Sequence, residues 1–156
     1  MGIKSFQGKR EVHKGTENTQ FLVSDYMTKK LITFKPDDTL DDVIHLLIAH
    51  KISGGPVVND KNELIGIISE TDCIKHISES KYYNMPSDSG NNVAKKMITN
   101  VDTIEKDMNI FDAATKFINS KRRRFPVVEN GKLIGQISQK DVLKAALSFR
   151  GNTWKK

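Results

Sequence analysis

The sequence predicts an α+β (mixed α/β) fold made of two pseudo-symmetric β-α-β-β-α repeats packed sheet to sheet. Two observations carry this prediction. Residues 23–58 match residues 93–128 at an offset of 70 positions, and after a one-residue deletion the match continues at an offset of 69 as far as Lys75 and Lys144. Both copies also show the same order of helix and strand patterns, so chance does not explain the match.

Each copy carries an amphipathic helix. Apolar residues recur at the i, i+3, i+4, i+7, i+8 spacing of one helix face. In the first copy they are Leu40, Val43, Ile44, Leu47 and Ile48, and in the second Ile110, Ala113, Ala114, Phe117 and Ile118. Thr39 and Asn109 stand just before these runs and are predicted N-caps.

A hairpin and a second helix follow in each copy. Pro56 and Pro126 open short β-branched strands at residues 57–58 and 127–128. Turns are predicted at residues 59–62 and at Asn130-Gly131, which is a strong hairpin signal. The next strands, residues 64–68 and 133–137, lead into helices that open at Ser69 and Ser138, and residues 31–34 and 101–104 supply a strand before the first helix.

The 156 residues therefore divide into five parts. They are a basic N-terminal arm (1–20), repeat 1 (21–80), a polar linker (81–92, with little structure expected from Ser78 onward), repeat 2 (93–149) and a basic tail (150–156). A unit near 60 residues hides only about 60% of its unfolded surface. The two sheets are therefore expected to pack together and to leave two equivalent clefts.

Composition and charge exclude several function classes. The net charge is +6, but the arm carries +2 and the tail +3, so residues 21–149 keep only +1 and the charge distribution argues against a nucleic-acid reader. No apolar run is long enough for a membrane helix, no secretory signal is recognised, and a cytoplasmic location is expected.

The single cysteine, Cys73, is expected to be a buried small residue and leaves no disulfide or thiol cluster for a metal. His45 and His50 do not share a helix face and no phosphate-binding loop is present, so we expect no enzyme, no catalytic residue and no metal site.

Three segments of the first copy together resemble a known family. Residues 23–28 (Val-Ser-Asp-Tyr-Met-Thr), residues 55–58 (Gly-Pro-Val-Val) and residues 66–72 (Gly-Ile-Ile-Ser-Glu-Thr-Asp) together resemble a CBS domain, and residues 135–141 repeat the last motif. The chain thus resembles a tandem CBS pair, or Bateman module, from about Phe21 to Phe149. The resemblance implies a regulatory module without a cofactor that binds AMP, ADP, ATP or S-adenosylmethionine, that associates as a homodimer, and that signals to an unknown client protein.

The resemblance also implies that each cleft draws residues from both copies. Asp72 and Asp141 would accept hydrogen bonds from two ribose hydroxyls, and the planar guanidinium groups of Arg123 and Arg124 would suit phosphate. The first cleft would combine Ser69, Thr71, Asp72, Asn100, Asp102, Arg123, Arg124 and Phe125. The second would combine Thr28, Lys30, Ile32, Ser53, Gly54, Gly55, Ser138 and Asp141. In the second copy, Asn100 and Asp102 stand at the positions of Lys30 and Ile32. The sequence therefore does not settle how adenine would pack in the first cleft.

Structural alternatives exist for each motif. Ser-x-x-Asp at a helix start resembles a capping box, in which both residues only satisfy backbone amides. The basic run of residues 121–124 could be a solvated turn, and Gly54-Gly55 could either admit a base or form a flexible lead into Pro56. The corresponding rival functions are a ligand-free dimerisation scaffold and a nucleic-acid-associated protein that uses its basic tails.

Overall fold

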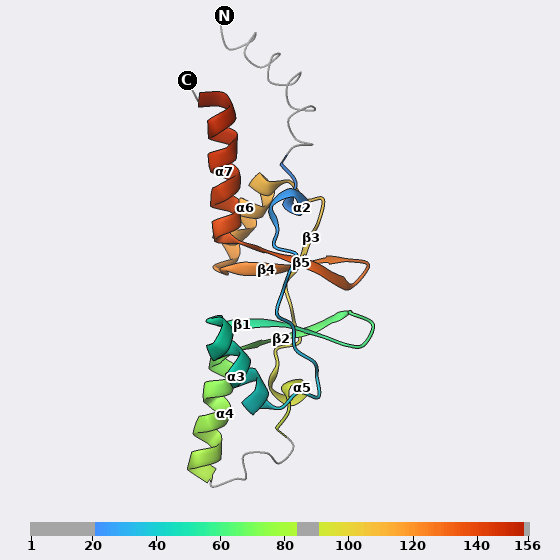
Figure 1. Cartoon of the computed structure of the whole chain (residues 1–156), viewed down its shortest axis with the longest axis vertical. Coiled ribbons are helices and arrows are strands. Elements are labelled where there is room, and N and C mark those ends of the chain that lie inside the picture. The colour runs from blue at the N-terminus through green and yellow to red at the C-terminus, as the bar shows by residue number, and fades with distance from the viewer. Residues whose placement is uncertain (1–20, 84–90, 155–156) are drawn as a thin grey trace, which may run out of the picture. The chain divides into compact units, whose positions relative to one another are not determined.

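The computed structural model describes residues 21–83 and 91–154, which fall into two compact units (Figure 1). The α6–α7 unit contains the described residues 21–29, 103–129 and 134–154. The α3–α4 unit contains residues 30–83, 91–102 and 130–133. Each unit therefore joins the helices of one copy to the initial segment of the other copy. The mixed α and β class with two repeats is confirmed.

The α3–α4 unit holds a hairpin with two helices on the same side of it (Figure 1). Its elements are α3 (Leu40–His50), β1 (Gly54–Val58), β2 (Leu64–Ser69), α4 (Glu70–Tyr83) and α5 (Val93–Lys96). The predicted cap of α3 is confirmed, because Thr39 Oγ1 accepts a hydrogen bond from the Asp42 amide at 3.1 Å. The strands β1 and β2 pair antiparallel, with Gly54 opposite Ser69, so the end of the hairpin lies at the start of α4.

The α6–α7 unit repeats this plan with one more paired strand. Its elements are α2 (Val23–Tyr26), β3 (Ile104–Glu105), α6 (Ile110–Ser120), β4 (Arg124–Glu129), β5 (Lys132–Ser138) and α7 (Gln139–Trp154). The sheet has the order β3-β4-β5. Asn109 Oδ1 accepts from the Phe111 amide at 2.8 Å, which confirms the second predicted cap. Asn130 and Gly131 have φ angles of 54° and 80°, as the predicted tight turn requires.

The short helices α2 and α5 were not predicted, and each completes a core formed by the other copy. Val23 is fully buried in the core of the α6–α7 unit, and its amide donates to Met108 O at 2.8 Å. Val93 is fully buried in the core of the α3–α4 unit, and its amide donates to Asp38 O at 2.9 Å. A helix of four residues cannot bury an apolar side chain by itself. Each of these two helices instead buries its valine in the core that the other copy forms.

Several predicted boundaries differ from the structure. The strand predicted at residues 31–34 is reduced to a single bridge between Phe34 and Val57. Helix α4 continues to Tyr83, so the connection predicted from Ser78 is helical at its beginning. Helix α7 continues to Trp154, into the predicted tail. The predicted arm (1–20), residues 84–90 of the linker and residues 155–156 lie outside the described residues.

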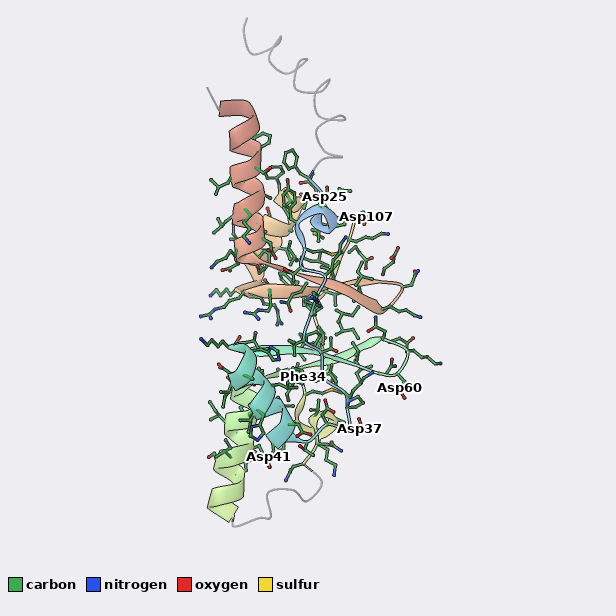
Figure 2. The ribbon with its side chains drawn as sticks, in the orientation of Figure 1. Asp25, Phe34, Asp37, Asp41, Asp60 and Asp107 are labelled. Carbon is green, nitrogen blue, oxygen red and sulfur yellow. The ribbon has the colours of Figure 1, made fainter. Side chains whose placement is uncertain are left out.

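The apolar stripes of the first helices are narrower than predicted. Phe34, Leu40 and Val43 are buried in the α3–α4 core (Phe34 is labelled in Figure 2). Ile48 and Ile118, at the far ends of the predicted stripes, are instead 71% and 77% exposed. Leu47 and Phe117, one residue earlier, are each only 5% exposed. Successive residues of a helix point about 100° apart, so the buried face of each helix ends between these neighbours. Within the described part of the chain, no helix has the length and apolar character needed to cross a membrane.

Candidate functional site

The junction of β2 and α4 holds Ser69 and Asp72 in a reciprocal hydrogen-bond pair. Asp72 Oδ2 accepts from the Ser69 amide and from Ser69 Oγ, both at 2.9 Å. Ser69 Oγ lies 3.4 Å from the Asp72 amide, which donates to it. This is the geometry of a capping box with aspartate in place of glutamate.

The junction of β5 and α7 has the same arrangement. Asp141 Oδ2 accepts from the Ser138 amide at 2.9 Å, and Ser138 Oγ accepts from the Asp141 amide at 3.2 Å. Both aspartates are only 8% exposed. The capping interpretation is therefore confirmed in both copies, and any role in ligand binding must be compatible with it.

Capping engages only one oxygen of each carboxylate. Among the described residues, no partner is found for Oδ1 of Asp72 or of Asp141. Ser120 Oγ is the one side-chain polar atom in the described chain that is both sealed from solvent and without a partner. The Oδ1 atoms are therefore not sealed, and each remains available to accept a hydrogen bond from outside the protein.

The α3–α4 unit brings several predicted residues to the start of α4. Gly54 pairs with Ser69 across the hairpin, and Ser53 O accepts from the Glu70 amide at 2.9 Å. Thr71 is exposed on the first turn of α4. Lys30, Asn100 and Asp102 are also exposed in this unit, and Ile32 is half-buried.

Packing explains both glycines at the start of β1. A Cβ atom on Gly54 would lie 2.7 Å from Ile68 O, and one on Gly55 would lie 2.9 Å from Phe34 Cε2. Both residues are held in strand β1, so the interpretation as a flexible lead into Pro56 is wrong. The face that a side chain would occupy is filled by the protein itself at both positions.

The α6–α7 unit brings together a second set. Thr28 pairs with Gln136, two residues before Ser138, and Arg123 O accepts from the Gln139 amide at 3.0 Å. Arg123 is exposed and Arg124 is half-buried at the start of β4. Within the described chain neither guanidinium forms an ion pair, so both can meet an anion.

Phe125 requires a correction. Its side chain is fully buried in the core, with its ring centroid 4.8 Å from that of Phe117. The Lys116 ammonium lies over the Phe125 ring, 5.2 Å from its centroid. The alternation of strand β4 turns this ring inward, so Phe125 can offer a ligand only its backbone groups.

The predicted clefts each mix residues of both units. Ser69, Asp72 and their neighbours lie in the α3–α4 unit, whereas Arg123, Arg124, Ser138 and Asp141 lie in the α6–α7 unit. Within its own unit, the structure places Ser53 and Gly54 beside Glu70 and Ser69, and Arg123 beside Gln139. The combination of the two sets into shared clefts stays a prediction.

One concave feature was not predicted. A groove of about 590 Å³, called here the α3–α4 groove, lies between these two helices. Its lining includes Ile48, Lys51, Glu70, Cys73, Ile74 and Ile77. The predicted burial of Cys73 is confirmed at 3% exposure, and this burial raises the pKa of its thiol. The sequence signal for this groove was the presence of Ile74 and Ile77 near Cys73, because a helix with one buried face needs fewer apolar residues than this.

The fold and the repeated Ser-x-x-Asp junctions define a tandem-repeat module with one helix-capping carboxylate per repeat. The sequence profile of the CBS domain matches residues 23–79 and 92–148. The chain belongs to the CBS domain family.

Known proteins with similar sequences include a plant and an archaeal protein. The chain is 31% identical to the CBS domain-containing protein CBSX1, chloroplastic, of Arabidopsis thaliana, over 83% of this chain and 66% of CBSX1. It is 31% identical to an uncharacterized protein of Methanocaldococcus jannaschii, over 81% of this chain and 91% of that protein. The chain thus spans about two thirds of the length of its plant relative.

A solved structure with a similar fold contains a ligand. The crystal structure of CBSX2 in complex with AMP matches with a TM-score of 0.73 and 32% identity, over 83% of this chain and 98% of that chain. CBSX2 is a CBS-pair protein of Arabidopsis thaliana. The similarity covers both repeats.

Proposed function

We propose that this chain is a non-catalytic regulatory module that binds an adenosine-containing ligand and signals its presence to a partner protein. The ligand class is AMP, ADP, ATP or S-adenosylmethionine. The observation that carries the proposal is the pair of buried aspartates, Asp72 and Asp141, each held by one oxygen and open at the other. The complex of CBSX2 with AMP supports the ligand class.

The ribose is the part of the ligand that each aspartate fits. Two neighbouring ribose hydroxyls can both donate to one carboxylate, and such charge-assisted hydrogen bonds are stronger than neutral ones. The capping bonds fix the orientation of each carboxylate before a ligand arrives. A preorganised acceptor binds more tightly because less freedom is lost on binding.

The arginines at the start of β4 are proposed to bind the phosphate group of the ligand. Residues 93–149 carry a net charge of +5, whereas residues 21–80 carry −4, and the first copy has Ser53 and Gly54 in place of Arg123 and Arg124. A ligand site that includes these arginines would prefer AMP, ADP or ATP. Ser69, Thr71, Asp72, Asn100 and Asp102 are proposed to complete that site.

The second proposed site combines Ser138 and Asp141 with residues of the first copy. Thr28 is placed beside it by the pairing with Gln136. The remaining proposed members are Lys30, Ile32, Ser53, Gly54 and Gly55, of which the last two can contribute only through their backbone. This site has fewer cations and would tolerate the uncharged end of an adenosine-containing ligand.

We further propose that the module works as a homodimer in the cytoplasm. The cytoplasmic location is a proposal from the sequence, and CBSX1 and CBSX2 are both described as chloroplastic. The client protein would respond to a population shift between free and ligand-bound conformations, which requires that the client distinguishes the two.

The alternative is a ligand-free dimerisation scaffold. The confirmed capping bonds favour it, because they explain Ser-x-x-Asp in both copies without a ligand. Under this alternative, removal of the aspartates would lower stability but nothing would bind.

Thermal denaturation with AMP, ADP, ATP and S-adenosylmethionine distinguishes the two functions. A ligand at 100 times its dissociation constant adds about 2.7 kcal/mol to the free energy of unfolding. That corresponds to a rise in the melting temperature of roughly 5–11 °C for a chain of this size. A flat response to all four ligands would favour the scaffold.

Site variants then test the assignment. Asp72→Asn and Arg124→Ala should each remove most of the ligand-induced rise. The matched control is Asp37→Asn, which removes the same charge at an exposed position outside the proposed sites (Figure 2). Unchanged ligand binding in both site variants would exclude the proposed phosphate-binding site.

A further inference from the structure

Where helix α6 begins, the α6–α7 unit carries a cluster of four aromatic rings, called here the aromatic patch: those of Phe21, Tyr26, Phe111 and Phe149. The Phe21 ring is the centre, with its centroid 6.4 Å from that of Tyr26, 5.9 Å from that of Phe111 and 5.3 Å from that of Phe149. Phe21 is 5% exposed, Tyr26 and Phe149 are half-buried, and Phe111 is 47% exposed. The core therefore uses Phe21 and leaves much of the Phe111 ring in contact with solvent.

The repeat itself does not require aromatic residues at these positions. The equivalent residues of the other copy are all polar: Asn91 for Phe21, Lys96 for Tyr26, Asp41 for Phe111 and Ser80 for Phe149. In the α3–α4 unit, Lys96 donates a hydrogen bond to Glu79 at 2.8 Å, so this position takes part in an exposed ion pair. Because the same plan of helices and strands forms without these rings, folding alone does not explain the exposed ring of Phe111.

The segments that carry the aromatic patch are acidic. Residues 21–26, 105–112 and 145–149 contain four acidic residues and one lysine, a net charge of −3. The lysine, Lys106, is already paired with Glu129 at 2.7 Å. Exposed carboxylates flank the rings, and in the described chain none of them forms an ion pair: they are Asp25, Asp107 and Asp112 (the first two are labelled in Figure 2). The patch thus combines an exposed aromatic face with uncompensated negative charge.

This combination selects among classes of binding partner. Aromatic rings can stack on the bases of a single-stranded nucleic acid, but the phosphates would meet a net charge of −3. Anionic lipid headgroups would be repelled in the same way. A lysine or arginine side chain gains from both features, because its cation is attracted to the ring face and to the carboxylates.

We infer that the aromatic patch docks a lysine- and arginine-rich segment of the client protein. The cations of this segment lie over the Phe111 ring and pair with Asp107 and Asp112. The inference rests on the proposed function for the existence of a client and adds the surface that the client contacts. The patch is also continuous with the second proposed ligand site, because Thr28, two residues after Tyr26, pairs with Gln136.

Peptide titration of the full chain tests this surface with defined probes. The basic probe is a dodecapeptide with the repeat Lys-Leu-Arg-Gly, and the acidic probe has the repeat Glu-Leu-Glu-Gly. The basic probe should shift the amide NMR signals of Tyr26, Phe111 and Asp112, and its affinity should fall as salt increases. Equal binding of both probes, or shifts confined to the α3–α4 unit, would overturn the inference.

Variants of the patch then separate a specific contact from net charge. Asp107→Asn with Asp112→Asn should weaken binding of the basic probe by roughly 2- to 30-fold, as expected for the loss of two exposed ion pairs. The matched control is Asp37→Asn with Asp42→Asn, which removes two charges at the equivalent exposed positions of the first copy and should leave the affinity nearly unchanged. Phe111→Ser removes the exposed ring and should weaken binding by about 2- to 5-fold. An equal loss in the patch and control variants would contradict the inference.

The same spectra and samples test the other occupants. A labelled oligothymidylate should leave the Phe111 signal in place, and a shift of this signal would assign the patch to nucleic acid. Lys9→Gln with Arg10→Gln should leave the Phe111 signal of the free chain unchanged, and a displacement would assign the patch to residues 1–20 of the chain itself. Phe111→Ser should not change the mass measured by sedimentation equilibrium, and a lower mass would assign the patch to a second copy. Each of these three shifts would overturn docking of a client.

Titration with AMP distinguishes failure of this inference from failure of the proposed function. A chain that binds the basic probe but no adenosine-containing ligand would refute the proposed function and keep the aromatic patch as a docking surface. A chain that binds AMP but not the basic probe would refute only the inference.

Discussion

Replacement of Gly135 by alanine tests whether the initial segment of the chain is held on the α6–α7 unit by close packing. A methyl group on Gly135 would lie 2.7 Å from Met27 Sδ and 2.9 Å from Thr28 O. The flexible thioether can move away. The Thr28 backbone cannot move without loss of its pairing, in which its amide donates to Gln136 O at 2.8 Å and its carbonyl accepts from the Gln136 amide at 2.9 Å.

The expected loss of stability follows from these contacts. Overpacking costs about 1–3 kcal/mol. Loss of the two hydrogen bonds would add about 1 kcal/mol each if the segment detaches. We therefore expect Gly135→Ala, with detachment of the segment, to lower the free energy of unfolding by about 3–5 kcal/mol and the melting temperature by roughly 6–20 °C.

Circular dichroism gives the melting temperature, and hydrogen exchange of the Thr28 amide reports on the segment directly. The control is Gly131→Ala, at φ 80° with no atom within 4 Å of the added methyl, which carries only a backbone cost of about 1–2 kcal/mol. Gly135→Ala should accelerate exchange at Thr28, and Gly131→Ala should not. A smaller melting shift than in the control, with unchanged protection of Thr28, would refute the packing argument.

Three other predictions concern single side chains. Because burial raises the pKa of Cys73, alkylation of the native thiol at pH 8 should be at least about tenfold slower than in urea, and equal rates would contradict its burial. A hydrogen bond from Lys96 at 2.8 Å lowers the pKa of Glu79, so this contribution to stability is present above the unfolded-state pKa of about 4.3 and is lost as the pH falls through the folded-state pKa. Accordingly, the difference in melting temperature between the wild type and Lys96→Met should shrink on acidification, and a constant difference would count against the pair. Phe21 is 5% exposed in an aromatic cluster with Tyr26, so Phe21→Ala should cost about 3–5 kcal/mol by chemical denaturation, and a loss below about 1 kcal/mol would show that the segment does not depend on it.

The local elements could be predicted because their signals lie within a few residues. The helical spacing from Leu40 to Leu47 and the cap residue Thr39 define α3 without tertiary information. Asn130-Gly131 defines its turn because both residues adopt positive φ at low cost. The internal repeat then extends each prediction from one copy to the other.

Features that depend on tertiary packing could not be predicted in the same way. Helices α2 and α5 are too short to show a period, and their exchange between the units depends on Val23 and Val93 reaching the core of the other copy. The burial of Phe125 depends on its packing against Phe117 in the core, and the exposure of Ile48 depends on how much of the α3 surface the core covers. Ser-x-x-Asp was predicted either to cap or to bind, and the structure shows that capping leaves one oxygen of Asp72 open.

Calorimetric titration of the full chain with AMP and with 2′,3′-dideoxyadenosine monophosphate tests the ribose assignment most directly. If Asp72 and Asp141 accept the ribose hydroxyls, the dideoxy compound should bind about 10- to 100-fold more weakly, as expected for loss of a charged hydrogen bond. In the double variant Asp72→Asn, Asp141→Asn the two nucleotides should bind with nearly equal affinity. Equal affinity of both nucleotides for the wild-type chain would contradict the account.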